Sequence, residues 1–234
     1  MTAAPLCGGI IAAGDGTRLR QAGFSGPKPL VPIAGVPLIA GVINNFLAAG
    51  ITRLVIIVND DARNCVDRVR ERFPGGDITF VVKTTRSSLE SFLEVGRRLG
   101  RGRALISTVD AWCRPADFVR FVDAAMRRGD EANVLAVTPL VDDEKPLWVN
   151  IDADGRVKNV GGQPGALVTA GMYVVTERAR TATPPSLARL RDFLAWLVEQ
   201  GEPVYAETIE TVVDVDRAAD VALAEALASR GGSK

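Results

Sequence analysis

The sequence predicts a doubly wound α/β fold, with a mostly parallel sheet and a smaller antiparallel region. Through residue 140, short apolar and β-branched runs alternate with segments of helical periodicity, which is the pattern of βαβ units. After Pro139, two short runs flank an Asp-Ala-Asp-Gly turn, as in a β-hairpin. With 234 residues, of which 47% are hydrophobic, the chain can bury a core on both faces of such a sheet.

The elements of the first part can be assigned in order. Apolar, β-branched runs predict strands at residues 6–13, 54–58, 78–82, 104–109 and 134–137. Helical periodicity predicts helices at residues 37–50, 62–73 and 88–99, and a fourth that begins at Pro115. Pro37 and Gly50 mark the ends of the first helix, and Ser87 and Glu90 have the spacing of a capping box. A long loop is expected between the first strand and Pro37.

The pattern changes in the second part of the chain. We expect residues 147–151 and 157–160 to form a hairpin, and residues 168–175 to form a strand that pairs with it. Pro184-Pro185 then interrupts the chain. The remaining expected elements are a helix at residues 187–200, a strand near Val204, a helix at residues 217–228 and a flexible tail at residues 230–234.

The predicted topology brings two segments to one edge of the sheet. Ligands of parallel α/β sheets bind at the carboxyl ends of the strands. The glycine-rich loop around Gly14 and Gly16 follows the first strand, and Asp110 follows the strand at residues 104–109. We therefore expect both at the same edge, within one domain that covers residues 1–229.

The charges and cysteines exclude several classes of protein. The chain has 28 basic residues, 28 acidic residues and no histidine, so histidine-based catalytic relays and zinc sites are excluded. Zero net charge argues against a nucleic-acid partner. The odd number of cysteines (Cys7, Cys65 and Cys113) indicates reduced thiols, and we expect a cytoplasmic protein. We expect no signal peptide and no membrane span, because no apolar run approaches ~20 residues.

The loop after the first strand carries the clearest chemical signal. Gly14 and Gly16 lack a Cβ, so backbone amides can approach an anion there. Arg18 can donate two parallel hydrogen bonds to phosphate oxygens, and Lys28 adds a compact positive charge. The loop is neither a P-loop, because Lys28 stands too far from Gly16, nor a dinucleotide fingerprint, because Leu19 occupies the third glycine position.

This segment resembles the signature of the sugar-1-phosphate nucleotidylyltransferases. Their pattern is a strand, then Gly-x-Gly-Thr/Ser-Arg-Leu, then Pro-Lys-Pro-Leu-x-Pro and Gly-x-Pro-Leu-Ile. The matching residues here are Gly14-Asp15-Gly16-Thr17-Arg18-Leu19, Pro27-Lys28-Pro29-Leu30-Val31-Pro32 and Gly35-Val36-Pro37-Leu38-Ile39. Related cytidylyltransferases and molybdopterin guanylyltransferases usually lack Lys-Pro-Leu-x-Pro, so the sugar-phosphate branch is the better match. Weaker likenesses extend over residues 104–110, 170–174 and 213–220.

The resemblance implies a Rossmann-like, nucleotide-diphospho-sugar transferase fold and the transfer of NMP from an NTP to a sugar 1-phosphate. It implies that Arg18, Lys28 and Asp110 are catalytic, and that Asp110 and Asp214 hold Mg²⁺, with Asp216 competing for the place of Asp214. The implied nucleotide contacts are Ala12, Ala13, Gly14, Asp15, Gly16, Thr17, Arg18, Ser87 and Ser88. The implied acceptor contacts are Lys28, Lys158, Ala170 and Gly171.

The same resemblance divides the domain into a nucleotide-binding half, residues 1–139, and an acceptor-binding half, residues 140–229. The expected partners are a nucleoside triphosphate and a sugar 1-phosphate, with no nucleic acid and no membrane. The sequence leaves the oligomeric state open, including a homo-oligomer.

The chain departs from the family pattern in ways that keep other functions open. Gly162-Gln163-Pro164 stands where many members have Glu-Lys-Pro, so the lysine that meets the acceptor phosphate is unassigned. Residues 84–91 resemble small cytidylyltransferases that act on phosphocholine or another phospho-alcohol. A third alternative is a catalytically silent relative that binds nucleotide or sugar phosphate and regulates a partner.

The missing histidine agrees with the implied reaction. The nucleophile would be a phosphate monoester, whose second pKa is about 6, so it is largely ionised at pH 7 without a general base. The reaction then needs cations and positioning.

Overall fold

A computed structural model of the chain describes residues 6–141 and 145–231. The helices are α1 (Thr17–Gln21), α2 (Leu38–Ala48), α3 (Asn64–Arg72), α4 (Ser88–Gly96), α5 (Pro115–Arg127), α6 (Glu177–Arg180), α7 (Leu190–Glu199) and α8 (Ala218–Gly231), with the 3₁₀ helices η1 (Lys28–Leu30) and η2 (Asp60–Ala62). The strands are β1 (Cys7–Ala12), β2 (Pro32–Ile33), β3 (Val36–Pro37), β4 (Arg53–Val58), β5 (Asp77–Val82), β6 (Ala104–Thr108), β7 (Ala111–Trp112), β8 (Asn133–Thr138), β9 (Trp148–Ile151), β10 (Val157–Val160), β11 (Leu167–Val175), β12 (Val204–Thr208) and β13 (Val213–Asp214).

These elements match the expected ones within a few residues, and the differences lie in the loops. The segment expected as a long loop contains α1, η1 and the small hairpin of β2 and β3. Such short elements are held by tertiary contacts rather than by a sequence period. Helix α8 continues through Gly231, so the start of the expected tail is helical, and residues 232–234 lie outside the described part.

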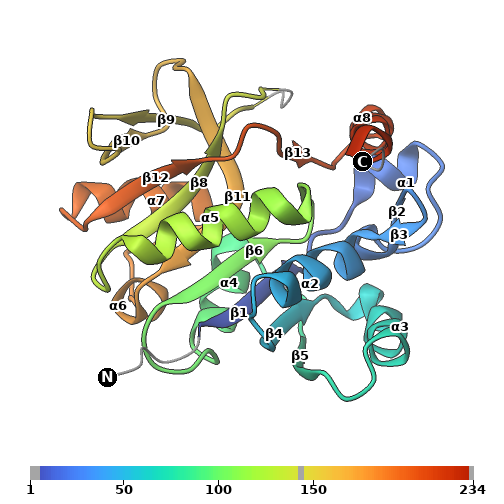
Figure 1. Cartoon of the computed structure of the whole chain (residues 1–234). Coiled ribbons are helices and arrows are strands. Elements are labelled where there is room, and N and C mark those ends of the chain that lie inside the picture. Colours follow the sequence, from blue (N-terminus) through green and yellow to red (C-terminus); the bar gives the residue numbers. More distant parts are fainter. Residues whose placement is uncertain (1–5, 142–144, 232–234) are drawn as a thin grey trace.

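The central sheet has the predicted mixed character. Strands β6, β1, β4 and β5 form a parallel array, with β1 between β6 and β4. Strand β11 runs antiparallel to β6 and also pairs with β8 and β9, which begins the antiparallel region. The hairpin of β9 and β10 lies at one end of the sheet, and β12 pairs with β8 in parallel (Figure 1).

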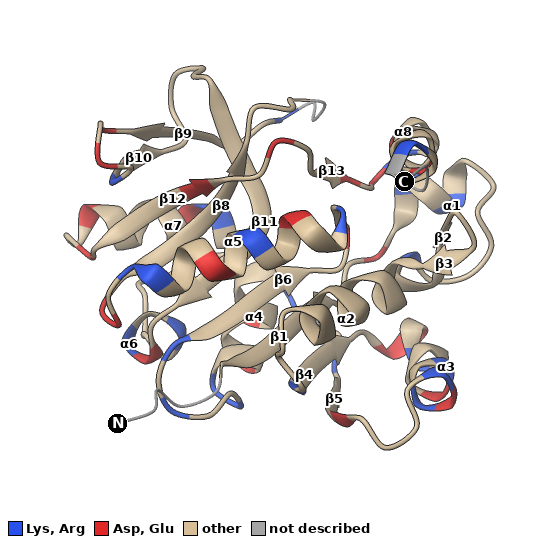
Figure 2. Cartoon of the chain, viewed as in Figure 1, with Lys and Arg blue, Asp and Glu red and all other residues tan. Residues whose placement is uncertain are grey.

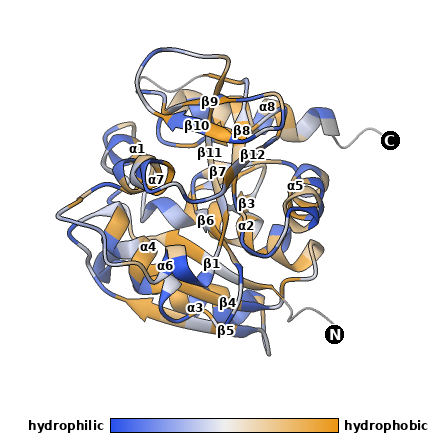
Figure 3. Ribbon diagram, turned by 90° about the vertical axis from the view of Figure 1, so that its left-hand side faces the viewer, coloured by the Kyte–Doolittle hydropathy of each residue, from blue (hydrophilic) through white to orange (hydrophobic). Residues whose placement is uncertain are grey.

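Helices cover both faces of the sheet, as expected for a doubly wound fold. One buried cluster joins the sheet to α2, α3, α5 and α8, and a second joins the opposite face to α4, α6 and α7. Aromatic pairs link neighbouring helices: Phe46 lies 5.2 Å from Phe118, and Phe92 lies 5.5 Å from Phe193, measured between ring centroids. Figure 3 shows the hydrophobic strands enclosed between the helical layers.

A small two-stranded sheet brings the C-terminal segment to the end of β6. Strand β13 pairs antiparallel with β7, so that Asp214 lies opposite Ala111. The backbone N–H of Val215 also donates to the carbonyl of Asp110 at 3.0 Å. Residues more than 100 positions apart therefore meet at the carboxyl edge of the parallel strands, where the glycine-rich loop also lies.

Charged residues lie mainly on helices and in connecting segments, while most of the central strands carry few (Figure 2). Within residues 6–141 and 145–231, no helix has the length and apolar character needed to cross a membrane.

Candidate active site

The glycine-rich loop packs tightly at one glycine and is open at the other. Gly16 has a φ of 61°, in the left-handed region, and a Cβ there would lie 2.6 Å from the Cβ of Lys28. At Gly14, no described atom outside its own neighbours lies within 4 Å of the place a Cβ would take. The loop is thus fixed against Lys28 at Gly16, and a ligand can reach the backbone at Gly14.

Asn59, at the end of β4, holds this loop in place. Its side chain is 5% exposed, and its Nδ2 donates to the carbonyl of Ala13 at 3.3 Å. Its Oδ1 accepts from the backbone N–H of Ala62 at 2.8 Å and so caps η2. The loop therefore keeps its position through a buried side chain of the neighbouring strand.

Four charged side chains meet beside the loop, and we call them the charge cluster: Arg18, Lys28, Asp110 and Asp216. Nζ of Lys28 donates to Oδ2 of Asp110 at 2.7 Å and to Oδ1 of Asp216 at 2.9 Å. Arg18 donates to the other oxygen of Asp216 at 2.5 Å. The side chain of Lys28 is 7% exposed, whereas those of Asp110 and Asp216 are 26% and 35% exposed. The carboxylates are thus accessible to a ligand, while the lysine lies beneath them.

The cluster keeps its two central groups ionised. Burial lowers the pKa of Lys28, but the charges of Asp110, Asp216 and Asp214 together raise it above its ordinary value. Burial raises the pKa of Asp110, but the charge and hydrogen bond of Lys28 outweigh burial and hold that pKa below its usual value. At neutral pH the site therefore contains a fixed ammonium group against a fixed carboxylate.

Asp216 reaches the cluster because the chain around it is anchored on both sides. Strand β13 precedes it, and Asp220, which is 2% exposed, follows it in α8. One oxygen of Asp220 accepts the backbone N–H groups of Asp216 and Arg217 at 2.9 and 2.6 Å. This is the hydrogen bonding of a helix start, and it fixes the backbone of Asp216.

A cavity of about 320 Å³ opens next to the charge cluster. Arg18, Asp110 and Asp216 form part of its wall, together with Asp214. Strand β11 and the start of α7 supply further residues: Val168, Thr169, Ala170, Gly171, Tyr173, Leu190 and Arg191. The cavity wall therefore combines residues from before and after residue 139.

A bulge in β11 shapes the floor of this cavity. The register with β8 shifts between Thr169 and Tyr173, and Gly171 has a φ of 70°. A Cβ at Gly171 would lie 2.5 Å from Oγ1 of Thr108 and 2.9 Å from Cβ of Ala111. Because residue 171 is glycine, β11 can pass close to Thr108, the last residue of β6, and to Ala111, the residue after Asp110.

Tyr173 places a buried phenol at the cavity. It is 5% exposed, and burial together with the charges of Asp110 and Asp214 raises its pKa, against the smaller effects of Arg191 and of a hydrogen bond from Thr169. The phenol therefore stays protonated at neutral pH and can donate a hydrogen bond.

The structure brings together most of the residues named from the sequence. Arg18, Ser88, Asp110, Ala170, Gly171 and Asp214 line the cavity, and Lys28 contacts Asp110 beneath it. Ala12 ends β1 and Ala13 follows it, and Asp15 and Thr17 are exposed around the loop. Ser87 caps α4 by accepting the N–H of Glu90. Lys158 is the exception: its side chain is 59% exposed, bonds to Asp152 at 2.9 Å, and does not line the cavity.

Sequence reasoning missed the parts of the site that depend on distant packing. Tyr173 and Arg191 gave no local motif, since one lies in a buried strand and the other at a helix start. Asn59 had a usable signal, because an asparagine followed by Asp-Asp at a strand end is typical of an N-cap. Asp216 was one of two alternatives, and the structure adds that it contacts Lys28 directly.

The acidic residues suit a cation that is shared with a phosphate ligand. In the described ranges, no group of three or more acidic or cysteine side chains is arranged as a metal cage. Mg²⁺ commonly uses one or two carboxylates, with water and phosphate oxygens completing its shell. Asp110 and Asp216 already converge on one cationic atom, Nζ of Lys28, and Asp214 lines the same cavity. The donor set therefore fits such a cation.

Comparison with known protein families agrees with the loop and the fold. Residues 8–152 match the model of the MobA-like NTP transferase domain. The chain belongs to this family. The match includes the glycine-rich loop, Lys28 and Asp110, whereas Asp216 and the cavity residues of β11 and α7 lie beyond it. The match confirms the resemblance to nucleotidylyltransferases that was inferred from the sequence.

Two curated relatives show the range of this NTP transferase family. The chain is 28% identical, over 75% of its length, to CMP-5'-(3-aminopropyl)phosphonate synthase of Streptomyces rubellomurinus, and the match covers 29% of that protein. It is 30% identical, over 58% of its length, to UTP–glucose-1-phosphate uridylyltransferase of Escherichia coli K12, covering 39% of it. The chain thus spans less than half of these relatives.

A solved structure matches the NTP transferase chain throughout. The inositol-1-phosphate CTP transferase from T. maritima superposes with a TM-score of 0.84 at 19% identity, covering 100% of this chain and 99% of the other. A likeness at this identity establishes the fold, and it confirms the expected α/β architecture.

Proposed function

We propose that the chain is a nucleotidylyltransferase that transfers NMP from an NTP to a sugar 1-phosphate and releases pyrophosphate. An oxygen of the acceptor phosphate forms the bond to the α-phosphorus. The bond from that phosphorus to the bridging oxygen breaks, and pyrophosphate leaves with the electron pair. The observation that carries the proposal is the charge cluster, which lies between the open glycine-rich loop and the cavity of about 320 Å³.

The site can support this reaction without a general base. The acceptor phosphate is largely dianionic at pH 7, because its second pKa is about 6. Two polyanions must then be held together, which requires fixed positive charge and in-line positioning. Lys28 supplies a charge that stays ionised, since the surrounding carboxylates raise its pKa.

Each part of the site has a proposed role. The backbone from Ala12 to Gly16 receives the nucleotide, because Gly14 leaves it open to a ligand. Arg18 neutralises the β- and γ-phosphates and exchanges its bond with Asp216 for phosphate oxygens. Lys28 lies beneath Asp110, and from there its charge would act on the donor and acceptor phosphates.

We propose Mg²⁺ as the divalent cation of this site. Asp110 and Asp216 would hold it, because both carboxylates line the cavity and are partly exposed to a ligand. The sequence resemblance implies Asp214 instead of Asp216, and Asp214 lines the same cavity. When bound, the cation would supply further neutralisation of phosphate charge.

The size of the cavity supports a small acceptor. A volume of about 320 Å³ lies at the lower end of the range of ligand pockets. Polar groups for hydroxyls come from Thr138, Thr169 and Tyr173, and apolar walls come from Leu140, Leu147 and Val168. A monosaccharide phosphate has this combination of size and mixed polarity, and the E. coli relative is named for glucose 1-phosphate.

A phospho-alcohol is the second candidate acceptor, with CTP as the donor. One solved structure that matches this chain over its whole length is an inositol-1-phosphate CTP transferase, and the relative from Streptomyces is named for a CMP-phosphonate product. The likeness of residues 84–91 to small cytidylyltransferases points in the same direction.

A matrix of substrates tests both candidates. ATP, CTP, GTP, UTP and dTTP would each be combined with glucose 1-phosphate, myo-inositol 1-phosphate and phosphocholine in the presence of Mg²⁺, and pyrophosphate release would be measured. Turnover with a sugar 1-phosphate supports the first candidate, and turnover confined to CTP with an alcohol phosphate supports the second. No release with any pair, from a protein that still binds nucleotide, would favour the catalytically silent alternative.

A further inference from the structure

Three arginines line the cavity, and they differ in their partners. Arg18 bonds to Asp216, and Arg217 bonds to Asp220. Arg191 donates to a neutral group, the backbone carbonyl of Lys145, at 3.1 Å. Across residues 6–141 and 145–231, no carboxylate lies within ion-pair distance of Arg191. Its positive charge therefore faces the cavity without a carboxylate from the described chain to neutralise it.

The start of α7 fixes the position of Arg191. The backbone N–H of Leu190 donates to Oγ of Ser88 at 3.0 Å, which ties α7 to the start of α4. Leu190 is 5% exposed, and Phe193, one turn later, is fully buried against Phe92 of α4. The backbone that carries Arg191 is therefore anchored by a hydrogen bond and by buried packing.

A neutral hydrogen-bond donor lines the same cavity as this arginine. Tyr173 is buried in the cavity wall, to which Arg191 and Asp110 also contribute. The phenol is also bonded to Thr169 across the bulge of β11. One cation and one hydroxyl group thus line the same cavity as Arg18, Asp110 and Asp216 of the charge cluster.

We propose that Arg191 binds the phosphate group of the acceptor and that the hydroxyl of Tyr173 provides a second hydrogen bond to it. The inference rests on the proposed function, and it supplies the cation that the sequence leaves unassigned. A guanidinium group binds phosphate through two parallel N–H bonds and fixes its orientation as well as its charge. Arg191 would thereby direct one phosphate oxygen toward the α-phosphorus near Lys28.

Two other positions bear on this role: Lys158, which was predicted as an acceptor contact, and Gln163, which stands where the family has a lysine. Lys158 is bonded to Asp152 on the hairpin of β9 and β10 and does not line the cavity. Gln163, at the position of the family lysine, is exposed and also lies outside the cavity lining. Arg191, at the start of α7, is therefore the better candidate for the acceptor cation than either position.

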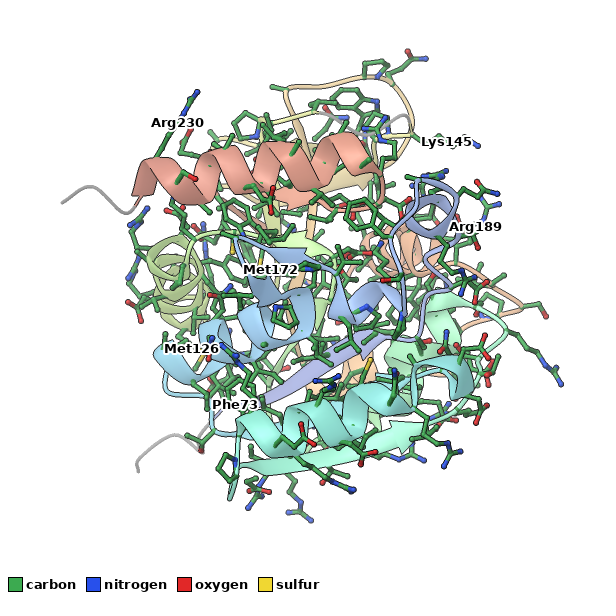
Figure 4. The ribbon with its side chains drawn as sticks, turned by 90° about the vertical axis from the view of Figure 1, so that its right-hand side faces the viewer. Phe73, Met126, Lys145, Met172, Arg189 and Arg230 are labelled. Carbon is green, nitrogen blue, oxygen red and sulfur yellow. The ribbon has the colours of Figure 1, made fainter. Side chains whose placement is uncertain are left out.

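Phosphorus NMR of the full chain tests the proposal directly. Glucose 1-phosphate, myo-inositol 1-phosphate and phosphocholine would each be titrated with wild-type protein, and binding would be read from the broadening of the ³¹P line. The variants are Arg191→Gln, Arg191→Lys and the control Arg189→Gln. Arg189 is exposed, lies outside the cavity lining, and is found near Lys145 at the molecular surface (Figure 4).

We expect at least one monoester to bind the wild type. Arg191→Gln should lower the affinity for that monoester by about 10- to 100-fold, which is the loss expected when a hydrogen bond to a charged group is removed. Arg191→Lys should recover part of the loss, since lysine restores the positive charge but not the two parallel N–H bonds of a guanidinium group. Arg189→Gln should bind the monoester as the wild type does. The affinity for the NTP should change less than twofold in all three variants, a bound of about 0.4 kcal/mol.

The outcomes separate this inference from the proposed function. Equal binding by Arg191→Gln and wild type, or no binding of any monoester by wild type, would overturn the inference. A parallel loss of NTP affinity in Arg191→Gln would also overturn it, because the effect would not be confined to the acceptor. Selective loss of monoester binding without turnover in any substrate pair would support the acceptor site and refute the proposed reaction.

Discussion

Lys28 and Asp110 are separated by 82 positions in the sequence and by 2.7 Å between Nζ and Oδ2. One follows the loop after β1 and the other follows β6, and β1 and β6 are neighbouring parallel strands. The pairing is thus a consequence of the sheet order. Because each group shifts the pKa of the other toward its charged form, the fold maintains an ion pair at the edge where the two substrates would meet.

Replacing Gly16 tests the packing of the loop on Lys28. Gly16→Ala adds a Cβ at a φ of 61° and 2.6 Å from Cβ of Lys28. We expect a loss of about 1 to 3 kcal/mol in the free energy of unfolding, measured by urea denaturation. Gly14→Ala is the matched control and should change stability by less than about 0.5 kcal/mol, because its Cβ would meet open space. Equal effects at the two glycines would contradict this description of the loop.

A pair of variants decides which carboxylate accompanies Asp110. Asp216→Asn should raise the Mg²⁺ concentration needed for half-maximal turnover by about tenfold or more, because it removes a charged ligand. Asp214→Asn should have a smaller effect on that concentration, since Asp216 is the residue in contact with Lys28. The measurement is pyrophosphate release across a Mg²⁺ titration. The opposite order of the two effects would restore Asp214 as the ligand.

Replacing Arg180 tests whether its side chain stabilises the segment that follows α4. Its side chain is 1% exposed and donates to the carbonyls of Gly96, Leu99, Gly100 and Gly102. Arg180→Met would leave those carbonyls without this donor, and we expect a loss of about 2 to 4 kcal/mol in the free energy of unfolding. The control is Arg178→Met, whose side chain is 65% exposed. Its stability should stay within about 0.5 kcal/mol of wild type.

The reactivity of the three cysteines toward a thiol reagent tests whether Cys65 and Cys113 are buried. Burial raises the pKa of Cys65 to about 11 and that of Cys113 to about 12. A raised thiol pKa means that the reactive thiolate is scarce at pH 8 and increases only as the pH approaches that value. At pH 8 we expect a thiol reagent to label Cys7 first, because it is half-buried, and to label the other two after denaturation. Rapid labelling of all three in the native protein would contradict the described core.

Sequence reasoning predicted the parts of the structure that depend on local patterns. The strand and helix order follows from periodicity, and Pro37, Gly50 and the Ser87 cap fall where their chemistry predicts. The glycine-rich loop and Lys28 could be proposed for the site because the loop chemistry lies in one short segment, and Asp110 because a strand end is recognisable in the sequence. The structure brings Gly16, Lys28 and Asp110 together.

The remaining features required the tertiary structure. The pairing of β7 with β13 joins residues about 100 positions apart, and it decides that Asp216 reaches Lys28. Arg191 and Tyr173 acquire their place only through the packing of α7 on α4 and the bulge in β11. Lys158, which was predicted as an acceptor contact, bonds to Asp152 on its own hairpin and does not line the cavity.

The central claim is that Lys28 acts on two phosphate-bearing substrates at this site. The most direct test is the rate of pyrophosphate release by Lys28→Met, with the best substrate pair, compared with wild type and with Lys158→Met. We predict a loss of about 100-fold or more for Lys28→Met in a protein that remains folded by circular dichroism, as expected for the removal of one fixed charge that stabilises the transition state. Lys158→Met should keep the wild-type rate. A folded Lys28→Met protein that retained a near-normal rate would contradict the account.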